Sequence, residues 1–239
     1  MRATKLEFRL RLVIIALILA LGFWSPWIEA VHLGRRIALL EWLALGLSRL
    51  GLLRFTVASP AVILAGAAIA ALAVILRVWG TAYMGHGIVA HAEMQAGRIM
   101  ADGPYRFARN PLYLGTWFMT IAMAFVMPPT GALFAVLLVG FFLLRLILGE
   151  EVFLASQLGE PYQAYTQTVP RLCPRLRGAP PSAGHKPQWV HAILAEIGPI
   201  GVFVALVFLS WSYDNLLMIR AILISFGVSL VVRAVLPRR

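Results

Sequence analysis

Six long apolar runs alternate with short polar segments along the chain. Each run holds about 16–20 residues, and a helix of that length covers about 24–30 Å, close to the thickness of the hydrocarbon core of a bilayer. The pattern predicts an all-α, polytopic membrane protein. About six transmembrane helices are expected, at Leu12–Ile28, Val57–Leu76, Leu112–Met127, Ala132–Leu148, Ile197–Tyr213 and Leu216–Val232.

The most specific local signal lies between the third and fourth runs, where residues 128–131 read PPTG. Two consecutive prolines fix φ and remove two amide donors, so the chain turns here instead of continuing as one helix. We therefore expect a tight helical hairpin. Such a hairpin returns the chain to the membrane face from which it started.

Two N-terminal segments are ambiguous. Residues 37–53 are apolar but contain Glu41 and Arg49. A charge at mid-bilayer costs about 2.5–3.5 kcal/mol, which favours a helix lying in the membrane interface over a seventh span. The basic start and apolar core of residues 1–24 resemble a signal peptide. No small-x-small cleavage site follows them, so a retained first helix is expected.

The composition supports a membrane protein and weakens other classes. The chain is 61% hydrophobic and 13% charged, whereas soluble domains are about 45–50% apolar and 25% charged. Its net charge of +11 comes from basic residues at the ends of apolar runs, a distribution typical of membrane flanks and not of nucleic-acid binding. The single cysteine, Cys173, excludes an internal disulfide and a cysteine-based metal site.

The positive-inside rule assigns the sides of the membrane. Six spans place both termini, residues 77–110 and residues 150–196 on one basic side, which we expect to be cytoplasmic. The arginines of residues 35–54 then fall on the opposite side and conflict with that rule. A prokaryotic inner membrane is the expected location.

A polar collar, GPYRFARNPLYLGTW at residues 103–117, directly precedes the third apolar run. Arginine and tyrosine at such a boundary often serve only as interfacial anchors. Because the hairpin returns to the same face, the polar residues of the collar should meet a pair of glutamates after the fourth run. The expected cluster is Arg106, Arg109, Asn110, Tyr113, Glu150 and Glu151. We place the glutamates at a helix C-terminus, where negative charge is unfavourable by about 0.3–1 kcal/mol.

Two weaker signals lie just before the collar. Residues 85–90, GHGIVA, match the letters of a dinucleotide-binding fingerprint, but no predicted strand precedes them. His86, His91 and Glu93 are possible metal ligands, yet the two histidines would lie about 140° apart on a helix and a metal site is not expected.

The collar, the hairpin and the segment GEEVFLASQLGEPYQAYTQTVPRLCP together resemble the isoprenylcysteine carboxyl methyltransferase family and the related phospholipid methyltransferases. The resemblance covers Trp79–Pro174. It implies a methyltransferase core in residues 79–178. The apolar runs place N-terminal transmembrane helices with an interfacial helix in residues 1–78, and a connector with two further helices in residues 179–239.

That resemblance implies an S-adenosylmethionine-dependent methyltransferase with a cytoplasmic cofactor pocket and a lipid-like acceptor that arrives from the bilayer. The implied pocket residues are Gly97, Arg98, Ile99, Met100, Tyr105, Asn110, Pro111, Leu112, Tyr113 and Glu150. Arg109 is expected to face the charges of the cofactor, since arginine binds carboxylates bidentately.

The acceptor stays open at this point. A carboxylate acceptor needs an arginine to orient it, for which Arg106 and Arg145 are candidates. An amine acceptor must lose a proton, for which Glu151 is the candidate base. Two other functions remain as alternatives, an NADPH-dependent membrane reductase of the sterol-reductase type and a non-catalytic membrane scaffold. Neither nucleic acid nor a metal is an expected partner.

Overall fold

The computed structural model describes residues 2–84, 94–95, 98–99, 101–175, 177–212 and 215–235, and it confirms an all-helical architecture for this part of the chain. A two-residue antiparallel pair, β1 (Met94–Gln95) and β2 (Arg98–Ile99), accompanies the helices. The N-terminal helices are α1 (Lys5–Arg9), α2 (Arg11–Trp24), α3 (Trp27–Ala30), α4 (Leu39–Arg49) and α5 (Phe55–Met84). They are followed by the 3-10 helix η1 (Gly103–Arg106), α7 (Pro111–Ala124), α8 (Pro129–Leu158), α9 (Glu160–Thr168), α10 (Trp189–Ala195), α11 (Ile197–Ser212) and α12 (Asn215–Val235).

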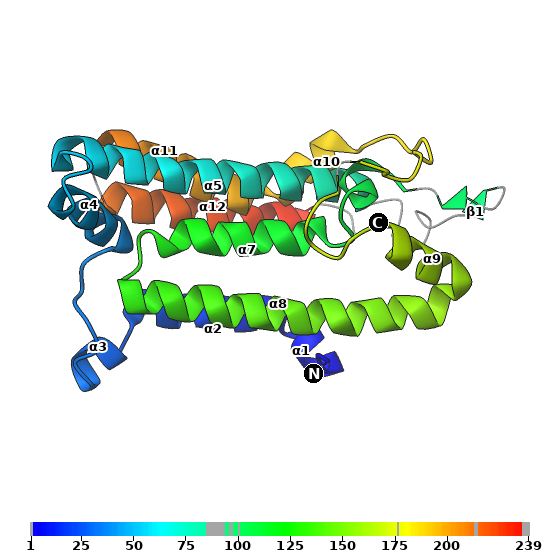
Figure 1. Cartoon of the computed structure of the whole chain (residues 1–239), viewed down its shortest axis with the longest axis horizontal. Coiled ribbons are helices and arrows are strands. Elements are labelled where there is room, and N and C mark those ends of the chain that lie inside the picture. The colour runs from blue at the N-terminus through cyan, green and yellow to red at the C-terminus, as the bar shows by residue number, and fades with distance from the viewer. Residues whose placement is uncertain are drawn as a thin grey trace.

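The long helices run side by side along the molecule (Figure 1). Helix α5 packs against α7 and α11, α7 packs against α8, and α2 also packs against α8. Small residues let these helices approach closely, as is common where lipid supplies no hydrophobic driving force between helices. A Cβ on Gly66 of α5 would lie 3.2 Å from Phe125, and a Cβ on Gly22 of α2 would lie 3.0 Å from the side chain of Ala135.

The predicted helical hairpin is formed by α7 and α8, and Pro128 and Pro129 begin its second helix. The predicted end of that helix is wrong, because α8 continues ten residues beyond Leu148, as far as Leu158. The residues after Leu148 are mostly good helix formers, and the helix stops only at Gly159, whose φ is 62°. Glu150 therefore lies about two turns inside α8, and the unfavourable helix-end position proposed for it does not exist.

Two helices of the described residues, α5 and α8, are long and apolar enough to cross a membrane. Helices α10 and α11 form a third candidate if the pair counts as one span bent by 67°. The apolar helix α2 and residues 220–232 of α12 are shorter. The protein is thus an integral membrane protein, while the count of six spans stays a prediction.

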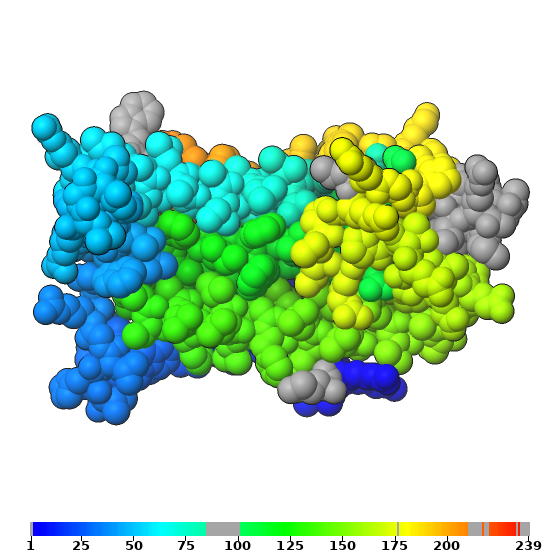
Figure 2. Space-filling model, in the orientation of Figure 1, coloured from blue at the N-terminus to red at the C-terminus, as the bar shows by residue number. Residues whose placement is uncertain are grey.

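The two ends of the bundle differ. Helix α4 is 11 residues long, packs on α5 and starts at the hairpin turn, where the Leu39 N–H donates to the carbonyl of Met127 at 2.7 Å. Its interfacial location stays a prediction. The opposite end carries α9, α10 and the connector between them, which covers the ends of the neighbouring helices (yellow in Figure 2). The candidate site lies at that second end.

Candidate active site

A cavity of about 670 Å³ opens among the helices at the end that carries α9 and α10, and we call it the polar pocket. Its lining residues are Phe8, Arg11, Leu12, Ile15, Arg77, Thr81, Met84, Tyr105, Arg109, Asn110, Pro111, Leu112, Tyr113, Thr116, Leu143, Leu146, Glu150, Leu154, His191, Ala195 and Glu196. Seven of the residues predicted to bind a cofactor are among them: Tyr105, Arg109, Asn110, Pro111, Leu112, Tyr113 and Glu150. The collar and the hairpin therefore meet as the sequence indicated.

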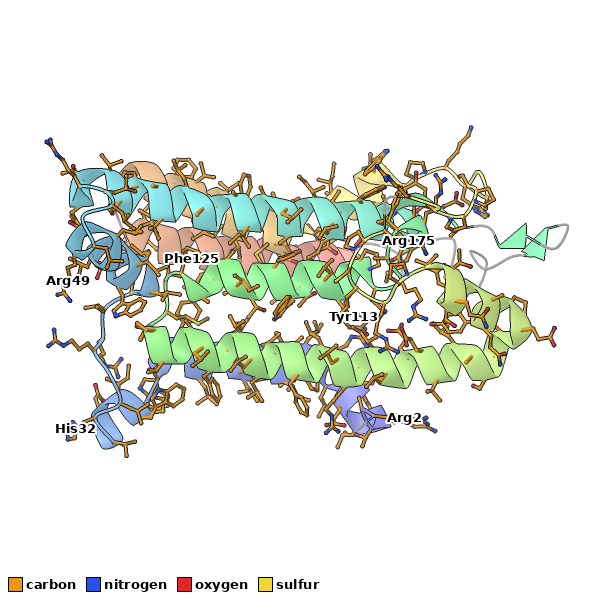
Figure 3. The ribbon with its side chains drawn as sticks, viewed as in Figure 1. Arg2, His32, Arg49, Tyr113, Phe125 and Arg175 are labelled. Atoms are coloured by element: carbon orange, nitrogen blue, oxygen red, sulfur yellow. The ribbon has the colours of Figure 1, made fainter. Side chains whose placement is uncertain are left out.

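Tyr113 joins the two helices of the hairpin. Its hydroxyl donates a hydrogen bond of 2.8 Å to Oε2 of Glu150, and the side chain lies between α7 and α8 (Figure 3). Asn110 precedes Pro111, the first residue of α7, and its amide nitrogen donates to the carbonyl of Arg171 at 3.2 Å. The start of α7 is thus fixed against both α8 and the segment after α9.

Arg109 is a charged residue of the pocket whose side chain is largely buried. Its side chain is 10% exposed, and Nη2 lies 3.3 Å from Oε1 of Glu151. Its Nε is buried and has no hydrogen-bond partner among the residues that the structure describes. A buried donor without a partner costs about 1–3 kcal/mol, and more in a charged group, so this atom indicates a place where a ligand would supply an acceptor.

Tyr105 forms the wall beside Arg109. The residue is 4% exposed, and its backbone carbonyl accepts a hydrogen bond of 2.7 Å from the hydroxyl of Tyr165 in α9. Burial raises the pKa of Tyr105, and the carboxylates of Glu150 and Glu196 raise it further. The phenol therefore stays neutral and lies in the field of both acids that line the pocket.

The remaining predicted residues lie elsewhere. Arg106 donates through Nε to the carbonyl of Pro180 at 2.7 Å, Arg145 pairs with Glu7 at 2.9 Å, and Glu151 pairs with Arg109 and Arg171. The structure places none of Arg106, Arg145 and Glu151 among the residues that line the polar pocket.

Several residues that the sequence suggested as cofactor or metal ligands precede the collar. Gly97 and Met100 lie outside the described residues, as do His86, His91 and Glu93. Arg98 and Ile99 are described only by their backbone in β2.

Sequence reasoning missed a second polar cluster in the pocket. Arg77 of α5 donates to Glu196 through Nε at 2.6 Å and through Nη2 at 3.1 Å. Thr81 donates to the same carboxylate at 2.8 Å, and Nη1 of Arg77 donates to Thr116 of α7 at 2.5 Å. Glu196 stands at the break between α10 and α11. A lone arginine near the end of an apolar run was the only available signal, and its partner is 119 residues away.

A second cavity of about 730 Å³ lies along the hairpin, and we call it the apolar groove. Its lining residues are Leu72, Leu76, Tyr113, Leu114, Trp117, Phe118, Val136, Leu137, Gly140, Phe141, Leu143, Leu144, Ile147, Leu172, Cys173 and Pro174. Among the described residues, Tyr113 and Leu143 line both cavities. The polar pocket and the apolar groove therefore adjoin at the start of the hairpin.

Asp102 ties the collar to the connector that leads to α10. The residue is 1% exposed. Oδ1 accepts from the hydroxyl of Ser182 and from the N–H of Gly184, while Oδ2 lies 2.6 Å from Nδ1 of His185. Burial acts to raise the pKa of Asp102, but these hydrogen bonds outweigh it and lower the pKa to about 2. Ser182 and His185 both contact the carboxylate, which is a structural arrangement and not that of a nucleophile with its base.

A comparison with protein families finds a match for the segment that contains the collar and the hairpin. Residues 61–161 match the model of the phospholipid methyltransferase family. We call these residues the phospholipid methyltransferase region. The phospholipid methyltransferase region comprises α5 from its second turn, η1, the hairpin and the start of α9, and it carries the predicted cofactor residues. No curated protein and no solved structure matched the chain.

The family match supports methyl transfer by an integral membrane protein that acts on lipid-like substrates. It covers 101 of 239 residues, so a substantial part of the pocket lies outside it. Seven lining residues come from other segments: Phe8, Arg11, Leu12, Ile15, His191, Ala195 and Glu196. The phospholipid methyltransferase region therefore forms its pocket together with the N-terminal helices and α10.

Proposed function

We propose that the protein uses S-adenosylmethionine to methylate a lipid-like acceptor at the cytoplasmic face of the membrane. The observation that carries this proposal is the contact between the two cavities at Tyr113. A charged, water-borne donor suits the polar pocket, and an acceptor with a long apolar chain suits the apolar groove. The acceptor is a phospholipid-type amine or an isoprenylcysteine-type carboxylate.

The chemistry of the pocket residues fits such a cofactor. S-Adenosylmethionine carries a carboxylate, an amino group, ribose hydroxyls and a sulfonium. The buried Nε of Arg109 lacks an acceptor among the described residues, and the cofactor carboxylate would supply one. Glu150 would accept from the amino group or the hydroxyls, and the ring of Tyr113 would attract the sulfonium by about 0.5–2 kcal/mol. The pocket volume of about 670 Å³ lies within the usual range for small-molecule sites, about 300–1,000 Å³.

When bound, the cofactor supplies an electrophilic methyl group, so the protein needs no covalent intermediate. The chain's own contribution is to hold the two reactants in line. Such alignment can supply about 7–11 kcal/mol of the barrier. Tyr113 is suited to this role because it lines both cavities and its hydroxyl is fixed by Glu150. The apolar residues of the groove would also exclude water from the reacting groups.

The two acceptor types make different demands on the pocket. A carboxylate can attack without losing a proton. An amine must first be deprotonated, and Glu151, the base suggested by the sequence, lies against Arg109 and Arg171 instead of lining the pocket. Glu150 lines the pocket and hydrogen-bonds Tyr113, so it is the better placed of the two to accept that proton.

Calorimetry with S-adenosylhomocysteine, the product form of the cofactor, tests the proposal on the full chain in detergent. We expect micromolar binding, corresponding to about −8 kcal/mol, and no comparable binding of NADPH. The exposed Arg36 pairs with Glu29 at the opposite end, and its replacement by methionine is the matched control. The absence of heat from S-adenosylhomocysteine with folded protein would refute the proposal, and binding of NADPH alone would favour the reductase alternative.

A further inference from the structure

Arg77 occupies the point where α5 passes from the apolar groove to the polar pocket. Leu72 and Leu76 line the groove, whereas Arg77 and Thr81 line the pocket. A group bound at Arg77 would therefore lie beside the entrance from the groove. None of the site residues predicted from the sequence lies on α5, so Arg77 represents a part of the pocket that has no role yet.

The guanidinium of Arg77 is held in place by residues of α5, of α7 and of the break between α10 and α11. Glu196 accepts two of its N–H groups, Thr116 accepts a third, and Thr81 donates to the same glutamate. Gly115 makes room for the stem, because a Cβ at that position would lie 2.6 Å from Cγ of Arg77. The side chains of Arg77 and Glu196 are 18% and 5% exposed. The arrangement fixes both the position and the orientation of the charge.

Stability alone is a poor explanation for this ion pair. Removing two charges from water is costly, and well-packed apolar residues often replace a buried pair with no loss of stability or with a gain. A guanidinium has five N–H donors. The hydrogen bonds found within the described residues use three of those of Arg77. Two donors remain for a ligand in the pocket that Arg77 lines.

The charges around the pocket favour an anionic ligand group. Arg11, Arg77 and Arg109 line it together with Glu150 and Glu196, which gives three formal positive charges against two negative ones. Arg109 pairs with Glu151 and lines the pocket together with Tyr105, Tyr113 and Glu150, the residues proposed to bind the cofactor. Arg77 is the arginine next to the groove, and the two arginines first considered for the acceptor, Arg106 and Arg145, do not line the pocket.

We propose that Arg77 binds the anionic group of the lipid-like acceptor, a phosphate ester or a carboxylate, and that Glu196 is a positioning residue that orients Arg77. The inference rests on the proposed function, since it assigns a binding group to that acceptor. Glu196 lies outside the phospholipid methyltransferase region, so a segment beyond the matched residues would complete the acceptor site.

The test measures binding of three single-chain lipids to the full chain in detergent. The probes are lysophosphatidic acid with a phosphate, N-acetyl-S-farnesylcysteine with a carboxylate, and monoolein without a charge. We expect at least one anionic probe to bind about tenfold or more tightly than monoolein, as charge-assisted hydrogen bonds require. The anionic probe that binds more tightly distinguishes a phosphate from a carboxylate ligand.

Two variants separate binding from folding. The double variant Arg77→Met, Glu196→Met replaces the pair by apolar residues and should reduce the preference for the anionic probe to about twofold or less. Binding of S-adenosylhomocysteine should stay within about threefold. The double variant Arg36→Met, Glu29→Met at the opposite end is the matched control and should keep the preference. If the pocket variant does not fold, Arg77→Lys preserves the charge without the bidentate geometry and should weaken anionic binding about fivefold.

A positioning role for Glu196 predicts a graded series. Glu196→Gln keeps an acceptor for Arg77 and should retain more of the anionic preference than Glu196→Ala, while both keep the affinity for S-adenosylhomocysteine. Equal binding of all three probes by the unaltered protein, or an unchanged preference in the Arg77 variants, would overturn the inference. Failure of S-adenosylhomocysteine to bind would instead count against the proposed function. The comparison of the three lipid probes would still test the role of Arg77.

Discussion

The polar pocket and the apolar groove adjoin at Tyr113, but they are built in different ways. The groove is lined by α5, α7 and α8 and by residues 172–174, and nearly all its side chains are apolar. The pocket draws on α1, α2, α5, η1, α7, α8 and α10, and its Arg77–Glu196 ion pair joins residues that are 119 positions apart. The groove is a product of helix packing, whereas the pocket depends on a few long-range polar contacts.

This difference has a physical origin. Apolar side chains on neighbouring helices line a groove wherever the helices separate slightly, and no single residue is decisive. A polar pocket inside a membrane protein requires that each buried charge find a partner, because an unpaired one is costly. Substitutions in the pocket should therefore have large and specific effects, and substitutions in the groove should have smaller effects that depend on size.

The largest effect is expected from Arg109→Met. The substitution removes the buried Nε that has no acceptor among the described residues, so the cofactor carboxylate would lose a charge-assisted hydrogen bond. We expect the affinity for S-adenosylhomocysteine to fall about 100-fold, equivalent to about 2.7 kcal/mol. Calorimetry measures this loss. Binding of monoolein in the groove should not change, and a parallel loss of both ligands would show that the two cavities are not independent.

Acid should lower the stability of the folded protein by protonating Asp102, which ties the collar to the connector. Its pKa is about 2 in the folded protein against 3.8 for the ordinary carboxyl. Because the pKa of Asp102 is lower in the folded state than in the unfolded state, its carboxylate stabilises the folded protein. This contribution is complete above about pH 4 and is lost as the pH falls toward 2. The loss amounts to about 2 kcal/mol. Thermal midpoints in detergent should fall over this interval. The Asp102→Asn variant should show a flatter dependence, and an equally steep one would assign the acid effect to other groups.

Filling the groove should impair the use of the acceptor without changing the binding of the cofactor. Leu144 lines the groove and is 43% exposed, so Leu144→Trp adds volume there without straining the core. We expect kcat/KM for the acceptor to fall about tenfold, a typical effect of a size mismatch in an apolar site. Affinity for S-adenosylhomocysteine should stay the same. The matched substitution Leu133→Trp, at an exposed position of α8 outside the groove, should leave both quantities unchanged.

The sequence predicted the parts of the molecule that depend on local pattern. Apolar runs and the two prolines at 128 and 129 were sufficient to predict the hairpin and the meeting of Tyr113 with Glu150. The end of α8 was missed because an apolar run ends where a membrane would end, whereas a helix continues until residues such as Gly159 stop it. The Arg77–Glu196 pair was missed because no local pattern links residues 119 positions apart.

The smallest effect, and the most informative one about the junction, is expected from Tyr113→Phe. The substitution keeps the ring that lines both cavities and removes only the hydroxyl that donates to Glu150. Loss of one hydrogen bond corresponds to about 1 kcal/mol, or about fivefold. Because the ring stays, affinities for S-adenosylhomocysteine and the lipid probe should each change less than the rate of methyl transfer measured with both bound. If instead one affinity alone accounts for the whole loss, Tyr113 serves a single cavity, and alignment across the junction depends on other residues such as Leu143, which also lines both.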